Sequence, residues 1–212
     1  LIGTGKNQIS MDRVSVEQAA PYAAADAVFT HRLTGDTRAE LEQLGLARLY
    51  HDLEVPLIPI LASMNLVGAR VDIPYLRTLS GEFATRLDEI KAQIYRSVGR
   101  EFNIGSPKQL NDILFEHLHL PTGGLRASTH GRSVDAEALE TLSAYHEAPR
   151  LILEWRGLEK LKNTYVDTLP AQADAEDRVH TSYNQTGAIT GRLSSDSPNL
   201  QNIPIRTEEG RR

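Results

Sequence analysis

A loop near the end of the sequence gathers four side chains that can donate hydrogen bonds: Arg192, Asn199, Gln201 and Asn202. In the minor groove of duplex nucleic acid, purine N3 and pyrimidine O2 accept hydrogen bonds in every base pair. Arginine, asparagine and glutamine donors therefore suit a protein that has to hold every base pair equally well. The surrounding glycine, serine and proline residues indicate a loop, so the same side chains could instead satisfy the turns of that loop.

A second row of donors is expected on a long helix between residues 148 and 169. At about 100° per residue, its large apolar side chains share one side: Leu151, Trp155, Leu158, Leu161 and Tyr165. Its donors share the opposite side: Arg156, Lys160, Asn163 and Thr164. Such a row suits the phosphates of a duplex, which supply affinity without sequence preference. The alternative is a solvated polar face with no ligand.

The elements that must hold these donors are predicted to be mostly helical. Ser15 starts a helix as the first residue of a capping box, and Gly35 is expected to end it. Residues 37–64 then have a helical pattern. Pro56 and Pro59 are expected to break or kink this helix, because proline lacks the amide donor and clashes with the preceding turn.

The most regular predicted helix begins at Asp72, with Pro74 in its first turn. Its apolar residues alternate at spacings of three and four and form one stripe: Leu76, Leu79, Phe83, Leu87, Ile90 and Ile94. This stripe fits a helix packed antiparallel against another. Ser106 starts a further helix, and Gln109 can complete its capping box. Composition and alternation predict the rest: an extended piece over 65–71, a loop over 120–132, a helix over 134–145 and a strand over 178–184.

Composition bounds the class of protein. The chain has 212 residues, a formal net charge of −5 and no cysteine. The absence of cysteine excludes disulfides and thiolate metal sites and favours a reducing cytoplasm. No apolar run is long enough for a membrane span. The net charge does not indicate nucleic-acid binding, but a binding surface can be local. His117 and His119 are two apart, so they do not share a helix face and are interpreted as surface residues.

Several strings in the last part of the chain point to one family: Ser182-Tyr183-Asn184-Gln185, Thr190-Gly191-Arg192-Leu193-Ser194-Ser195, Pro198-Asn199-Leu200-Gln201-Asn202-Ile203-Pro204 and Glu208-Glu209-Gly210-Arg211-Arg212. Together they resemble the segment just ahead of the first catalytic aspartate motif in family A DNA polymerases, the bacterial DNA polymerase I type. The residues around Trp155 resemble the long thumb helix of that family. Those from Phe102 to Leu110 resemble the start of its thumb-tip hairpin.

The resemblance implies a role for each matching residue. Arg192 is expected to reach the minor groove at the primer terminus, and Asn199, Gln201 and Asn202 to hold template or primer near the nascent pair. The thumb residues expected to contact the duplex are Arg156, Lys160 and Asn163. Those expected to contact backbone phosphates at the thumb tip are Asn103, Ser106, Lys108 and Ser133. One departure leaves the role of Asp196 open, because it lies one residue earlier than the family's aspartate before the Pro-Asn pair.

At the other end, the run from Tyr22 to Asp26 resembles the third motif of the family's 3′–5′ proofreading exonuclease. The spacing of four places both side chains one turn apart on one helix face. In the family's chemistry Asp26 would ligate a divalent metal, and Tyr22 would orient the attacking water in a two-metal site. The pair by itself is also compatible with an ordinary helix surface.

We therefore expect a mainly α fold, α+β overall, with long antiparallel thumb helices. The expected parts are the C-terminal portion of an exonuclease domain over 1–45, a polymerase thumb over 46–170 and the start of a palm, with a short β-strand, over 171–212. Both ends of the chain are interpreted as cuts in a longer polymerase. The palm aspartates are expected beyond Arg212, so we expect the isolated chain to be inactive in nucleotide addition.

The expected partners are primer–template DNA and, through the rest of the polymerase, deoxynucleoside triphosphates, with Mg²⁺ as the cofactor. No membrane partner is expected, and the protein is expected to be a monomer. Two alternatives stay open. A stand-alone 3′–5′ exonuclease has no use for the donors from Arg192 to Asn202. A non-catalytic DNA-binding module has no use for Tyr22 with Asp26.

Overall fold

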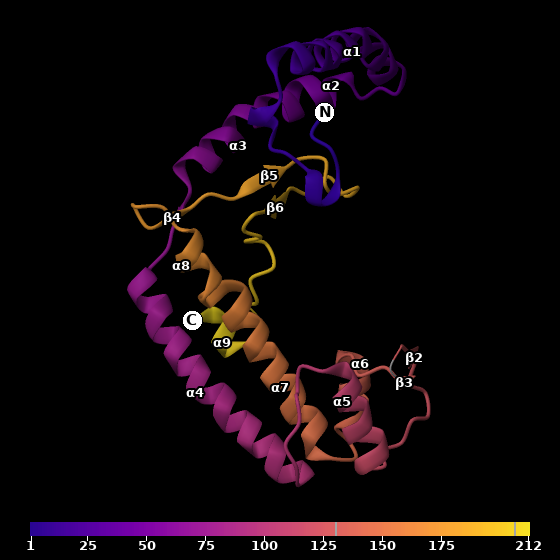
Figure 1. The fold of residues 1–212 in the computed structure, drawn as a ribbon, viewed down its shortest axis with the longest axis vertical. Helices are drawn as coiled ribbons and strands as arrows, with labels where there is room; N and C mark the ends of the chain where they lie inside the picture. The colour runs from indigo at the N-terminus through magenta and orange to yellow at the C-terminus, as the bar shows by residue number, and fades with distance from the viewer. Residues whose placement is uncertain (130, 206) are drawn as a thin grey trace. The chain divides into compact units, whose positions relative to one another are not determined.

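The computed structural model describes residues 1–129, 131–205 and 207–212 (Figure 1). The chain forms two compact units, Leu1–Ala62 and Ser63–Arg212. Helices dominate both units, and the strands are two or three residues long. This confirms the mainly α fold class. The three-part division at residues 45 and 170 stays a prediction.

The first unit begins with two short 3₁₀ turns, at Gly5–Asn7 and Met11–Arg13, and continues into helix α1, Val16–Gln43. Ser15 caps α1 as predicted, its hydroxyl accepting a hydrogen bond from the Gln18 amide. The prediction that Gly35 ends this helix is wrong. A glycine inside a helix costs only about 1 kcal/mol relative to alanine, and here the chain turns at Gly45, whose φ is +68°.

Residues 47–67 form a run of consecutive helical segments. Helix α2, Ala47–Leu49, passes through a π-helical turn, Tyr50–Glu54, into helix α3, Val55–Val67. The expected break at Pro56 and Pro59 is absent. Pro56 is the second residue of α3, directly after the π turn. Pro59 lies inside α3. The regular α-helical hydrogen-bond pattern changes in the π turn just before α3.

The second unit is organised by α4, Ile73–Val98, and α7, Glu147–Leu161, which run alongside each other in opposite directions (Figure 1). Asp72 caps α4 by accepting from the Tyr75 amide at 2.9 Å. The predicted stripe is confirmed: Ile90 and Ile94 are fully buried, in one cluster with Ile152 of α7. Burying each such side chain stabilises the fold by about 1.5–3 kcal/mol.

A small group of helices, here called the tip, packs at the N-terminal end of α7. It comprises α5, Pro107–Asn111, a π-helical turn, Asp112–His117, and α6, Ala136–Leu142. Between them the predicted loop contains a two-stranded ribbon, β2, Ala127–Ser128, paired with β3, Gly131–Arg132. The backbone of Arg132 is held by Asn111, whose amide group both donates to its carbonyl and accepts from its N–H. Loop composition did not reveal this long-range contact.

After α7 the chain passes through a π turn, Lys162–Val166, and helix α8, Thr168–Gln172. The predicted strand over 178–184 is divided into two pieces. β4, Arg178–Val179, pairs with β1, Ala69–Arg70. β5, Ser182–Asn184, pairs with β6, Ser194–Asp196. A four-residue helix, α9, Glu208–Arg211, follows. Within the described residues, no helix has the length and apolar character that crossing a membrane requires.

Candidate nucleic-acid interface

The loop from Arg192 to Asn202, here called the donor loop, is shaped partly by its own side chains. Oδ1 of Asn199 accepts hydrogen bonds from the amides of Gln201, at 3.0 Å, and Asn202, at 3.2 Å. The side-chain amide of Gln201 donates to the Leu193 carbonyl. Both sequence interpretations therefore apply to this loop, because some polar groups close its turns while others stay available.

The available donors of the donor loop are exposed. The guanidinium of Arg192 and the side-chain amide of Asn202 have no hydrogen-bond partner or ion pair among the described residues, and both residues are exposed. Asn199 uses its side-chain oxygen in the turn and keeps its NH₂ group. These three residues can therefore donate to an external acceptor without breaking a contact of the fold.

The predicted donor face of α7 is only partly free. Lys160 and Asn163 are exposed. Arg156 is half-buried, and its Nη1 donates to the carbonyl of Val134 at 2.5 Å. Burial lowers the pKa of this guanidinium from its ordinary value, although nearby Glu159 opposes that shift. Arg156 therefore connects α7 to the start of α6, a structural contact that the helical wheel did not indicate.

The predicted contacts at the tip lie around the start of α5. Ser106 caps α5 by accepting from the Gln109 amide. In a capping box the Gln109 side chain would accept from the amide of Ser106. Here its Oε1 accepts instead from the Asn103 amide at 2.7 Å. Lys108 is exposed beside them. Ser133 lies before α6, with its hydroxyl accepting from the Asp135 amide at 3.2 Å.

The two candidate exonuclease residues lie on α1, and both are exposed, Tyr22 by 56%. Four residues apart on one helix, they share a face as predicted. In the described part of the chain, no three histidine or carboxylate side chains come together as metal ligands. Asp26 is a single carboxylate and does not by itself fit a two-metal centre.

A family model described as DNA polymerase family A matches residues 73–212. The chain belongs to DNA polymerase family A. The match spans the helices α4 and α7, the tip and the donor loop.

Curated relatives of this family A chain are DNA polymerase I enzymes. It is 50% identical to DNA polymerase I of Chloroflexus aurantiacus and 44% identical to that of Pseudomonas aeruginosa, over its full length in both cases. The chain spans 23% of the length of each of these relatives. A solved structure of the polymerase domain of Pol1 from M. smegmatis, in complex with DNA primer–template and dNTP, matches 82% of this chain and 30% of that one, with 40% identity and a TM-score of 0.74.

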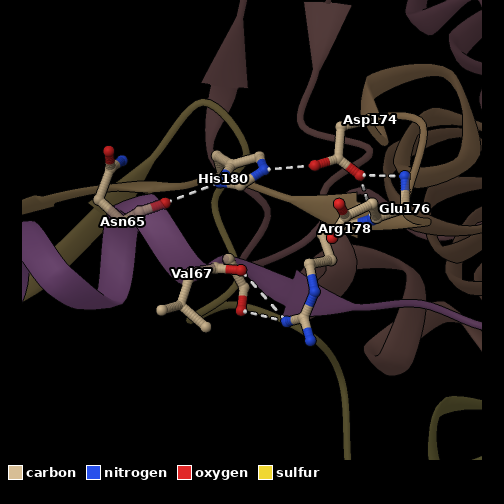
Figure 2. A network of polar contacts seen from close by, with 7 residues as sticks. Asn65, Val67, Asp174, Glu176, Arg178 and His180 are labelled. Carbon is tan, nitrogen blue, oxygen red and sulfur yellow. Dashed lines mark hydrogen bonds and ion pairs between the residues drawn. The ribbon is translucent and has the colours of Figure 1, made fainter.

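The family A chain also has a polar network that sequence reasoning missed, at the junction of α3 and β4 (Figure 2). His180 lies between two acceptors: Nδ1 is 2.7 Å from the Asn65 carbonyl, and Nε2 is 2.9 Å from Oδ2 of Asp174. The guanidinium of Arg178 donates to the carbonyls of Val67 and Gly68. The only signal in the sequence was polar residues interrupting the strand-like alternation around Val179.

Asp174 is the centre of this network. Its Oδ1 accepts from the amides of Glu176, at 2.8 Å, and Arg178, at 2.9 Å. The hydrogen bond from His180, followed by those two amides, lowers the pKa of Asp174 to about 2. The same contact with Asp174, together with the one to Asn65, raises the pKa of His180 above its ordinary value. The network fixes the turn that leads from α8 into β4.

Proposed function

We propose that this chain is the part of a DNA polymerase that grips primer–template duplex during template-directed nucleotide addition in DNA replication and repair. In this proposal α7 and the tip hold the duplex backbone, and the donor loop contacts the minor groove near the primer end. The observation that carries the proposal is the similarity to the Pol1 polymerase domain, whose structure was solved with primer–template DNA and dNTP. The protein is expected to work in the cytoplasm as a monomer.

The exposed donors support this assignment chemically. Lys160 on α7, Asn163 on the π turn that follows it, and Arg192 and Asn202 in the donor loop are exposed, and their side-chain donors have no partner among the described residues. A cation that contacts a phosphate releases a condensed counterion, so it contributes affinity that falls with salt. Minor-groove acceptors common to all pairs would let the donor loop bind without sequence preference.

We further propose that Tyr22 and Asp26 are residues of a 3′–5′ exonuclease site that requires Mg²⁺. Asp26 would supply one oxygen ligand, and the remaining ligands would come from outside the described residues. The support is the spacing of the pair and its position ahead of the segment that the polymerase family model matches. The polymerase reaction would also use Mg²⁺, but the DNA contacts predicted in the donor loop are hydrogen-bond donors and include no carboxylate.

The test of the grip is duplex binding measured by fluorescence anisotropy across a salt series. We expect the chain to bind a labelled primer–template without sequence preference and Lys160→Ala to make the plot of log K against log salt shallower by about one counterion. Lys91→Ala removes an exposed lysine from α4 and serves as the charge-matched control, with an unchanged slope. A slope that is equal in wild type and Lys160→Ala would contradict the contact.

The same preparation tests whether this chain binds DNA without catalysing nucleotide addition. We expect the chain to bind the primer–template but not to extend the primer when Mg²⁺ and all four deoxynucleoside triphosphates are present, because the predicted DNA contacts include no polymerase carboxylate. Gel analysis of the labelled primer measures this directly. Primer extension by the isolated chain would contradict the proposal that it binds duplex without catalysing nucleotide addition.

A further inference from the structure

Thr181 is a buried hydroxyl residue next to the donor loop, and it is not one of the proposed DNA contacts. It is only 3% exposed. Its Oγ1 lies 2.7 Å from the Pro198 carbonyl and 3.0 Å from the Asp196 carbonyl. A hydroxyl has one proton, so Thr181 shares it between the two carbonyls or donates to each in turn. These carbonyls flank the turn at which β6 leads into Asn199.

Thr181 is itself held from the other side. Nδ2 of Asn65 donates to the Thr181 carbonyl at 2.7 Å. The carbonyl of Asn65 faces Nδ1 of the neighbouring His180, as Figure 2 shows. Asn65 belongs to the last turns of α3. His180 and Thr181 are therefore both hydrogen-bonded to α3. The Thr181 hydroxyl in turn links α3 to the turn at Pro198.

A second buried hydroxyl acts on the same turn. Ser195 is 7% exposed, and its Oγ accepts from the Leu200 amide at 3.0 Å. Asn199 then accepts from the next two amides. The backbone from Asp196 to Asn202 is thus held by hydrogen bonds from inside, while the donor groups of Asn199 and Asn202 stay exposed. The buried polar groups of this segment therefore hold its backbone, and the exposed ones can bind a ligand.

We propose that Thr181 is a positioning residue for the donor loop, which orients Asn199 and Asn202 toward the duplex by holding the Asp196–Pro198 turn against the end of α3. This inference rests on the proposed duplex grip. A side chain that only filled space there would need no hydroxyl, and two backbone carbonyls would lose their donor without it. Both hydrogen bonds are partly buried, and losing them is unfavourable, so the turn is expected to open when the hydroxyl is removed.

The experiment compares Thr181→Val, which keeps the shape and removes the hydroxyl, with Thr181→Ser, which keeps the hydroxyl. Hydrogen–deuterium exchange of the Leu200, Gln201 and Asn202 amides measures loop order, and anisotropy with the primer–template measures binding. Ile90→Val, a core truncation in α4, is the control for a general loss of stability. All proteins are the full chain, measured at one pH and one salt concentration.

In Thr181→Val we expect these three amides to exchange about tenfold faster, because a hydrogen bond that holds the turn is lost. The amides of α4 and α7 should stay protected as in wild type. Its duplex affinity should fall several-fold, and Thr181→Ser should restore both readouts. The proposal is overturned if Thr181→Val and Ile90→Val change loop exchange equally, or if Thr181→Ser does not restore it. If wild type does not bind duplex, the proposed function fails, and loop exchange alone still decides the positioning role.

Discussion

Nε2 of His180 lies 2.9 Å from Oδ2 of Asp174, and the other ring nitrogen of His180 also faces an acceptor, the carbonyl of Asn65. A neutral imidazole has one N–H and can donate to only one of them. The two contacts are satisfied together only when His180 is a doubly protonated imidazolium. The junction between α3 and β4 thus depends on the charge of His180, whose pKa the contact with Asp174 raises.

This contact predicts a pH window for stability. The folded-state pKa of His180 is raised above 6.5, so its contribution is complete below about pH 6.5 and is lost as the pH rises through the folded-state value. Asp174 has its pKa lowered from 3.8 to about 2, so its contribution is complete above 3.8 and is lost as the pH falls toward 2. The contact should stabilise the fold most between these limits.

Thermal unfolding of wild type and His180→Asn across pH 3 to 9 measures the window. We expect the difference in Tm to be largest in the mildly acidic range and to shrink as the pH rises or falls beyond it. A Tm difference that does not vary with pH would mean that the ring contributes only packing. Lys91→Ala, which removes an exposed lysine from α4, provides the control.

Gly68 is predicted to be intolerant of any side chain. Its φ is +67°, and an added Cβ would lie 2.9 Å from the His180 ring and from the Val179 carbonyl. Left-handed backbone in a non-glycine residue costs about 1–3 kcal/mol, so Gly68→Ala should lower the free energy of unfolding by at least about 1 kcal/mol. Gly81 lies inside α4 with nothing near its Cβ position, and Gly81→Ala should stabilise by about 0.5–1 kcal/mol. Urea unfolding measures both; equal effects would refute the prediction.

Arg156 and Lys160 lie on the same helix and should respond differently to truncation. Because Arg156 donates to the buried Val134 carbonyl, Arg156→Ala should reduce the free energy of unfolding by about 1–3 kcal/mol. Lys160 is exposed, and its side chain has no partner among the described residues, so Lys160→Ala should leave stability within about 0.5 kcal/mol of wild type. Chemical denaturation of the two variants distinguishes them. An Arg156→Ala protein as stable as wild type would show that the Val134 contact contributes nothing.

Asn111 is predicted to hold the tip ribbon. It is 7% exposed, and its amide group pairs with both the N–H and the C=O of Arg132. Asn111→Ala leaves both backbone groups without a side-chain partner, which should cost about 1–3 kcal/mol. Asn163→Ala removes an exposed asparagine from the same unit and should be neutral. The measurement is the urea midpoint at constant m-value, and a neutral Asn111→Ala would contradict the assigned contact.

The helical framework was predictable because it depends on local chemistry. Ser15, Asp72 and Ser106 have the residue types of helix caps, and each does cap a helix in the structure. The stripe containing Ile90 and Ile94 follows the helical period and is buried as a unit. Helix ends were less predictable, because an interior glycine such as Gly35 costs little and the neighbouring residues decide whether the helix continues.

The sequence by itself determined the family, the helical class and the identity of the donors in the loop, since these depend on residue types and on their spacing along the chain. Only the tertiary structure decided which donors are free. Arg156 belongs to the donor face by helical period, yet the Val134 carbonyl, 22 residues away, occupies it. Thr181 and His180 resemble strand residues in the sequence, and their contacts with Asn65 join segments more than a hundred residues apart. No local pattern encodes such contacts, because they exist only once the chain has packed.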